Sequence, residues 1–214
     1  MNFIQGMVSN TNVVPKLTQS LHQMASERQG AYGMAVHGRQ GENMFLPRLH
    51  RVQCHAHGPN DASSHNKPKN GLQGLTGMGQ FLMADLNQQQ SSSALPHFSC
   101  GPNADLNTPP KVAVVCQGHL ENQTALRESL VERGYAFRGN SDGELIAHLL
   151  DATHQNDPLQ AVQRLLGLVN GVYGVGILFQ AYPDRLIAAQ QGTPMYLSIG
   201  PDHLGWSSGG PKLN

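Results

Sequence analysis

The chain has 214 residues, and its 14 Lys and Arg balance its 14 Asp and Glu, so the formal net charge is zero. A balanced charge gives no general attraction to nucleic acid or to an anionic membrane, and we expect neither as a partner. Three irregularly spaced cysteines argue against a disulfide framework. Together with the lack of a basic leader or a long apolar run, they favour a cytoplasmic protein.

The first fifty residues have the patterns of ordered structure. The opening MNFIQG predicts a short strand. The stretch VVPKLTQSLHQMASERQG then places Val14, Leu17, Leu21 and Met24 at helical spacing. The segments AYGMAVHG and NMFLPRLHRV predict two further strands.

The next sixty residues are rich in Gly, Pro, Asn, Ser and Gln, a composition typical of loops. We expect two loop-rich insertions, at about 51–74 and 87–110. The apolar segment GLTGMGQFLMADL between them predicts a strand.

Residues 111–208 are the most regular part of the chain. KVAVVCQG predicts a buried strand, and TALRESLVERG a helix that Asn122 caps and Gly134 ends. GELIAHLLDATHQ and DPLQAVQRLLGLV predict two more helices. Four strands follow in VYGVGILFQ, RLIAAQQG, PMYLSIG and HLGWSS.

Strands and helices come in blocks and do not alternate strictly. This order favours an α+β fold with antiparallel sheets over a doubly wound fold. The length fits one domain covering 1–214.

The passage KVAVVCQGHLENQTALRESLVERGYAF resembles the glutaminase domain of the class II glutamine amidotransferases, which have an N-terminal nucleophile. That family has a strand, His-Asn-Gly, Glu-Asn, a helix and Arg-Gly-Tyr-x-Phe. The matching positions here are Gly118, Leu120, Glu121, Asn122, Leu126, Arg127, Gly134, Tyr135 and Phe137. NSDGELIAHLL, GVYGVGIL and RLIAAQQGTPMYLSIG resemble later family segments in the same order. The resemblance implies a four-layer αββα sandwich of two antiparallel sheets.

The same register places Asn2 at the family's nucleophile, because MNFIQG stands where the family has Met-Cys-Gly-Ile-Val-Gly. In the family the methionine is removed, the cysteine thiolate attacks the glutamine side-chain amide, and its α-amine is the base. An asparagine amide cannot replace a thiolate, because its nitrogen lone pair is delocalised. We also expect Met1 to be retained, so that both nucleophile and base are missing.

Other parts of the family's glutamine pocket are altered in this register. Leu82 replaces the arginine that grips the α-carboxylate, and Met83 replaces a tryptophan. The oxyanion-hole pair Asn-Gly becomes Gln117 and Gly118. Asp142 is retained at the position that holds the α-ammonium group. The resemblance therefore implies a vestigial glutamine pocket.

Three functional interpretations follow. We favour a catalytically degenerate glutaminase-like domain that needs no cofactor and acts as a protein-binding or regulatory module. Its partner would be another protein or a second copy of the chain, and the vestigial pocket could take a small molecule.

The second interpretation is an active amidotransferase or amidohydrolase with a different nucleophile, for which Cys116 is the one thiol that the resemblance places near the cleft. The third is a metal-binding protein that uses Cys54, His55 and His57. Their irregular, loop-borne spacing favours incidental residues, and we expect no metal site.

Overall fold

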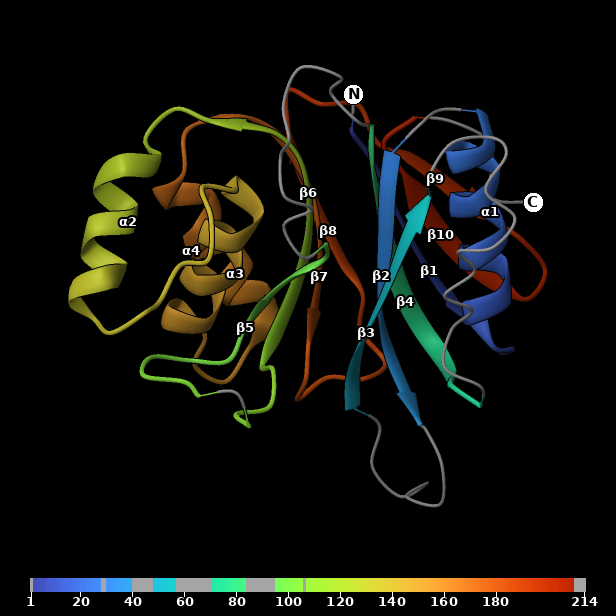
Figure 1. The fold of residues 1–214 in the computed structure, drawn as a ribbon, viewed down its shortest axis with the longest axis horizontal. Helices are drawn as coiled ribbons and strands as arrows, with labels where there is room; N and C mark the ends of the chain where they lie inside the picture. The colour runs from blue at the N-terminus through green and yellow to red at the C-terminus, as the bar shows by residue number, and fades with distance from the viewer. Residues whose placement is uncertain are drawn as a thin grey trace.

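The computed structural model describes residues 2–27, 30–39, 48–56, 71–83, 95–105 and 107–209. They contain two antiparallel sheets that lie face to face (Figure 1). Sheet A has the strand order β3-β2-β4-β1-β10-β9, and sheet B the order β5-β6-β7-β8. The strands of sheet A are β1 (Asn2–Ser9), β2 (Gly30–Arg39), β3 (Arg48–Ala56), β4 (Gln73–Met83), β9 (Tyr196–Ile199) and β10 (His203–Ser207). The strands of sheet B are β5 (His97–Ser99), β6 (Val112–Leu120), β7 (Gly171–Phe179) and β8 (Ile187–Gln191).

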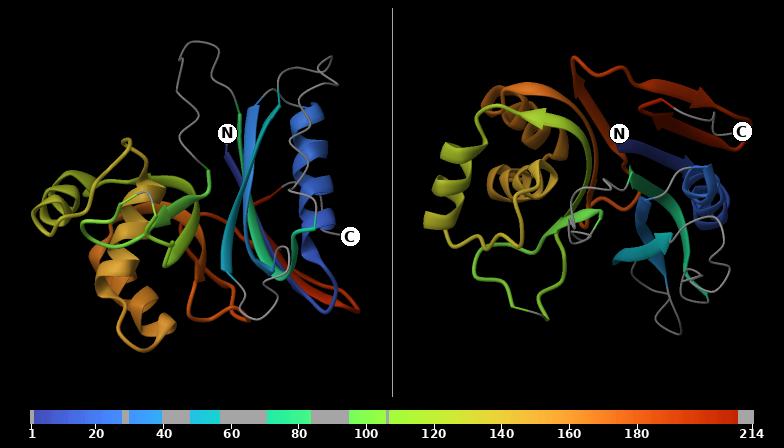
Figure 2. Two further views of the ribbon diagram at one scale, coloured as in Figure 1. Left: turned by 60° about the horizontal axis from the view of Figure 1, so that its bottom comes forward. Right: turned by 45° about the horizontal axis from the view of Figure 1, so that its top comes forward.

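Helices cover the outer faces of both sheets. They are α1 (Val13–Glu27), α2 (Gln123–Glu132), α3 (Asp142–Thr153) and α4 (Pro158–Leu168). Helix α1 lies on sheet A, and the other three lie on the far side of sheet B in every view (Figures 1 and 2). This is the expected four-layer αββα sandwich, and the α+β prediction is confirmed. None of the helices in the described ranges combines the length and the apolar sequence that a membrane-spanning helix needs.

The apolar spacing predicted for α1 is its buried face. Val14, Leu17, Leu21 and Met24 are all at most 5% exposed. Alternating glycines on β4 make the close approach possible, since a Cβ at position 79 would lie 2.5 Å from Leu21 Cδ1. The glycine-rich segment that follows the first insertion is therefore a docking strand for α1.

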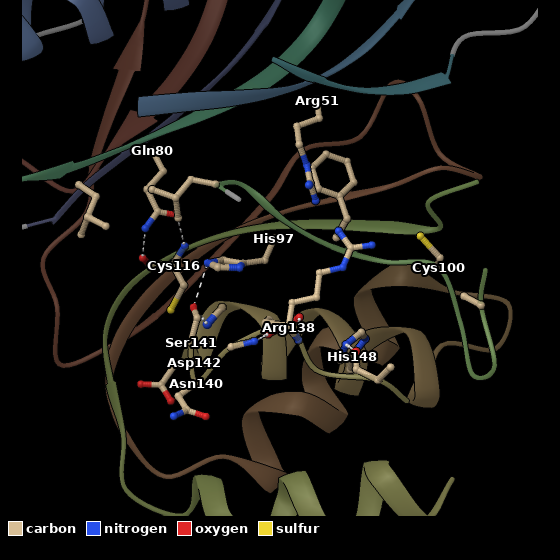
Figure 3. Close-up of a pocket in the computed structure, with 18 of the residues that line it drawn as sticks. Arg51, Gln80, His97, Cys100, Cys116, Arg138, Asn140, Ser141, Asp142 and His148 are labelled. Atoms are coloured by element: carbon tan, nitrogen blue, oxygen red, sulfur yellow. Dashed lines mark hydrogen bonds between the residues drawn. The ribbon is translucent and has the colours of Figure 1, made fainter. Parts of the chain in front are cut away.

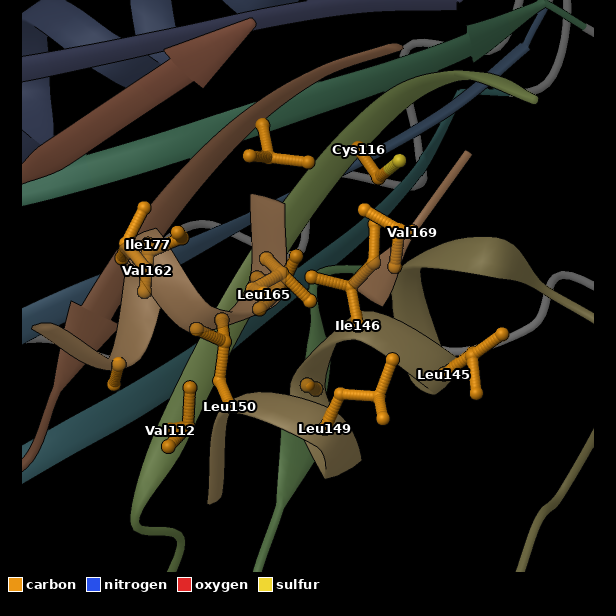
Figure 4. Packing of buried hydrophobic residues seen from close by; sticks show 14 of the residues in the cluster. Val112, Cys116, Leu145, Ile146, Leu149, Leu150, Val162, Leu165, Val169 and Ile177 are labelled. Atoms are coloured by element: carbon orange, nitrogen blue, oxygen red, sulfur yellow. The ribbon is translucent and has the colours of Figure 1, made fainter. Parts of the chain in front are cut away.

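The hydrophobic core has three layers. One lies between the two sheets, one between sheet A and α1, and one between sheet B and the other three helices. Residues of both sheets, among them Ile4, Met78, Val115 and Trp206, form the middle layer. The larger layer lies between sheet B and α2, α3 and α4 (Figure 4). Fully burying one large aliphatic or aromatic side chain stabilises a fold by about 1.5–3 kcal/mol. Burial in these three layers therefore supplies the main driving force for folding.

One of two local predictions for α2 needs correction. Asn122 precedes α2 as expected, but its side chain makes no capping bond. Instead it accepts from the Asn170 N–H at 3.0 Å and donates to the Leu168 carbonyl oxygen at 2.8 Å. It therefore joins the start of α2 to the end of α4. Gly134 ends α2 as expected, with φ of +87°.

The expected loop-rich insertions are also bounded differently. Strand β3 continues through Ala56, because its backbone pairs with β2 as far as Gly30 despite the polar side chains. Strand β4 begins at Gln73, and β5 lies inside the second insertion. Segments 57–70 and 84–94 lie outside the described residues.

Candidate functional site

A cavity of about 970 Å³ lies where β1, β4 and β6 meet the loop that leads into α3 (Figure 3). This volume is at the upper end of those of small-molecule sites. Four of the six residues predicted for the glutamine pocket line it, namely Asn2, Leu82, Gly118 and Asp142. Asn2 and Leu82 are direct cross-strand neighbours of β1 and β4. The predicted residues Gln117 and Met83 do not line the cavity.

Asp142 begins α3 at the wall of this cavity. Its Oδ2 accepts from the Leu120 N–H and lies 3.1 Å from His119 Nδ1. Its Oδ1 is buried and has no hydrogen-bond partner in the described part of the chain. A carboxylate in the first turn of a helix is stabilised by the helix dipole. Asp142 thus lies at the cavity with one carboxylate oxygen that makes no hydrogen bond within the described residues.

The loop before α3 is held on two sides. Glu144 accepts from the backbone N–H groups of Arg138 at 2.9 Å and Gly139 at 3.1 Å. Arg127 donates to the carbonyl oxygens of Gly139 at 2.9 Å and Ser141 at 2.7 Å. Hydrogen bonds to charged groups are among the stronger ones in proteins. The loop therefore forms a fixed wall of the cavity.

His97 and Ser141 form a pair that resembles a base and a nucleophile, with His97 Nε2 and Ser141 Oγ 2.9 Å apart. Burial, followed by the positive charges of Arg51, His148 and Arg127, lowers the pKa of His97 to about 4. A histidine with this pKa is a weak base near neutral pH. Ser141 also caps α3 by accepting from the Gly143 N–H at 3.2 Å. We therefore assign the pair to positioning α3.

Cys116 lines the same cavity from β6, and Cys100 lines it from the segment after β5. Burial, and then the nearby charge of Asp142, raises the pKa of Cys116 to about 12. The thiolate is the reactive form of cysteine, and a pKa near 12 leaves only about one thiol in 10⁵ ionised at pH 7. Cys116 therefore has the environment of a packed core residue.

Sequence comparison identifies the family. A family model described as a glutamine amidotransferase domain matches residues 101–213, just over half of the chain. This chain belongs to the glutamine amidotransferase family. The isomerizing glutamine–fructose-6-phosphate aminotransferase of Yersinia pseudotuberculosis is 31% identical over 199 residues, and that of Escherichia coli K12 is 30% identical. Each alignment covers 92% of this chain and 30% of the relative, so the chain spans about a third of the length of these relatives.

Solved structures support the amidotransferase fold. The glutamine phosphoribosylpyrophosphate amidotransferase from B. subtilis, in complex with ADP and GMP, matches with a TM-score of 0.69 and 18% identity. The match covers 96% of this chain and 41% of that chain. A structure described as the allosteric regulatory enzyme of purine biosynthesis matches with a TM-score of 0.71 at the same identity and coverage. The N-terminal-nucleophile amidotransferase fold expected from the sequence is confirmed.

One glycine of this amidotransferase domain is required by the backbone. Gly118 has φ of +108°, and a Cβ there would lie 2.1 Å from the Val172 carbonyl oxygen. This conformation and this approach leave room for glycine alone. The preceding Gln117 is half-buried, and its Oε1 has no hydrogen-bond partner within the described residues.

The structure does not describe the side chains of the three metal candidates. The backbones of Cys54 and His55 lie on β3, whereas their side chains and all of His57 fall outside what the structure describes. Elsewhere, in the part of the chain with described side chains, no three His, Cys, Asp or Glu residues lie close enough together to hold a metal ion. The metal-binding interpretation therefore gains no support from the described residues.

Sequence reasoning missed several residues that line the cavity, above all Arg51, His97 and Arg138. They come from β3, β5 and the loop before α3. Arg51 lies in a segment whose pattern predicts only a strand, and Arg138 directly follows Phe137, the last matched position of the first family passage. Neither periodicity nor spacing could have placed these residues together, because only the packing of the two sheets does so.

Proposed function

We propose that this chain is a glutamine amidotransferase domain that does not hydrolyse glutamine and serves as a binding or regulatory module. The observation that carries the proposal is that Asn2 lines the cavity. The family resemblance assigns this residue to the position of the nucleophile. Its carboxamide nitrogen is not nucleophilic, and its oxygen is a poor nucleophile without activation. The step that begins catalysis in the family therefore has no reacting group in this chain.

Two further features support the loss of hydrolysis. Leu82, directly beside Asn2, replaces the arginine expected to grip the substrate carboxylate, so the clamp that orients glutamine is missing. The thiol of Cys116 lies in the cavity but is held protonated by its raised pKa. Loss of a positioning clamp lowers the rate strongly even where a nucleophile remains, because reactive geometry is then seldom reached.

The relatives' names describe transfer of an amino group from glutamine to fructose 6-phosphate, and the chain matches about a third of their length. We do not extend that whole reaction to this chain. Our proposal is that the domain acts on a protein partner or on a second copy of itself, with Asp142 and the cavity available to a small molecule. Sedimentation velocity on the purified chain separates a self-associating module from a monomer.

An ammonia-release assay with glutamine tests the proposal. We expect no release above a no-protein blank, and mass spectrometry should find Met1 in place. The matched variant is Asn2→Cys with Leu82→Arg, which restores the thiol and the clamp together. Measurable hydrolysis by this variant alone would support the assignment of both positions. Hydrolysis by the natural chain that disappears in Cys116→Ala would instead favour an enzyme with a different nucleophile.

A further inference from the structure

Two guanidinium groups enter the cavity away from the positions inherited from the family. Arg51 projects from β3 in sheet A, and Arg138 projects from the loop before α3 on the opposite side (Figure 3). The Arg51 guanidinium stacks over the Phe98 ring at 4.3 Å from its centroid. Such stacking fixes the plane of the guanidinium and leaves its edge free to donate hydrogen bonds.

Neither arginine has an acidic partner within the described residues. The ion pairs found there join other residues. The carboxylate of Glu144, in the first turn of α3, accepts from two backbone N–H groups of the loop. Asp151 accepts from the hydroxyl groups of Tyr135 at 2.9 Å and Ser99 at 3.2 Å. The acidic groups around this end of the cavity are thus already used in holding the fold.

The two positive charges also act on each other. Burial, and then the charge of Arg138, lowers the pKa of Arg51. Like charges brought together in a partly buried space repel, and a bound counter-ion removes that cost. Arginine is suited to this role, because its planar fork donates two parallel hydrogen bonds to an oxyanion.

We propose that Arg51 and Arg138 form an anion subsite that binds the dianionic phosphate group of a small phosphate monoester. Two forks from opposite walls match a tetrahedral group with three terminal oxygens, and its double charge balances both arginines. A carboxylate offers two oxygens and a single charge, so it neutralises one arginine. The cavity, at about 970 Å³, has room for the rest of such a ligand beside Asp142.

Titration with inorganic phosphate tests this subsite, followed by calorimetry and by ³¹P line broadening in a phosphate-free, low-salt buffer. We expect saturable binding by the natural chain, and binding weakened at least about tenfold in Arg51→Gln and in Arg138→Gln, as for loss of a charged hydrogen bond. Arg138→Lys should bind phosphate with intermediate affinity, since lysine keeps the positive charge but cannot donate two parallel hydrogen bonds. Arg39→Gln is the matched control, because Arg39 is exposed and does not line the cavity. Its affinity should equal that of the natural chain.

Three outcomes would overturn the proposal. One is no saturable binding of phosphate at millimolar concentration, and another is equal affinity in Arg138→Gln and Arg39→Gln. The third is tighter binding of glutarate than of phosphate, which would assign the arginines to a carboxylate. Arg138 is exposed, so its variant decides the question even where Arg51→Gln fails to fold. Ammonia release is measured separately, and phosphate binding does not depend on whether glutamine is hydrolysed.

Discussion

The side-chain amide of Gln80 pairs with the backbone of Cys116 across the two sheets. Gln80 Nε2 donates to the Cys116 carbonyl oxygen at 2.7 Å, and Oε1 accepts from the Cys116 N–H at 3.2 Å. Strand β5 pairs with β6 only up to Val114, so the amide takes the place of a strand partner at Cys116, two residues further along β6. This pair fixes β4 against β6 at the floor of the cavity.

Replacing Gln80 should therefore destabilise the fold. Gln80→Leu has a similar volume but leaves a buried N–H and a buried carbonyl oxygen without partners. We expect a loss of about 2–4 kcal/mol in the free energy of unfolding, measured by urea denaturation. Gln73→Leu is the matched control, because Gln73 is exposed on the same strand, and its effect should stay within about 0.5 kcal/mol. Equal effects of the two substitutions would show that the pair contributes nothing.

Trp206 sets a second contact between the sheets, and two glycines of β7 test it. A Cβ at Gly176 would lie 2.2 Å from Trp206 Cζ2, whereas one at Gly174 meets nothing closer than 3.6 Å. Gly176→Ala should therefore cost about 1–3 kcal/mol through overpacking. Gly174→Ala, on the same face of the strand, should be nearly neutral. Thermal unfolding of the two variants measures the difference, and similar melting temperatures would contradict the role given to Trp206.

Acidification should weaken the fold through His97. Its pKa is about 4 in the folded chain against 6.5 as the ordinary value, so the unfolded chain binds the extra proton first. The stability from neutral His97 is fully present above pH 6.5 and is lost as the pH falls towards 4, by about 3 kcal/mol in all.

The variant His97→Gln isolates this effect, because glutamine takes up no proton. Burial also lowers the pKa values of His37 and His148. His37 acts equally in both proteins, whereas the charge of His148 acts on His97 and is part of the measured difference. The unfolding free energies of the natural chain and the variant should therefore converge between pH 6.5 and 4. A constant difference over that range, measured by urea denaturation, would rule out the assigned titration.

The sequence predicted the layers of this fold well, because local patterns and family motifs both carry them. The apolar stripe of α1 needed only helical spacing, and the helix predicted in DPLQAVQRLLGLV is α4, which Asp157 caps. The family register placed Asn2, Leu82, Gly118 and Asp142 around one cavity.

Long-range polar contacts could not be predicted in the same way. The Gln80 amide and the Cys116 backbone are 36 residues apart and carry no shared pattern. Asn122 was predicted to cap α2, but a local rule does not reveal that the end of α4 competes for the same amide. The facing arginines of the cavity depend on how sheet A lies over the loop before α3, which composition and periodicity do not encode.

The reactivity of the two described thiols gives the last test. Cys116 is 6% exposed with a pKa near 12, while Cys100 is half-buried and its pKa is raised by burial but lowered again by Arg138 and Arg51. Iodoacetamide at pH 8 should therefore modify Cys100 first, and Cys116 at least about a hundredfold more slowly, as peptide mass spectrometry can follow. In urea both should react at similar rates, which controls for intrinsic reactivity. Rapid modification of Cys116 in the folded chain would mean that its thiol is accessible and ionised, and it would again be a candidate nucleophile in a domain that we propose has none.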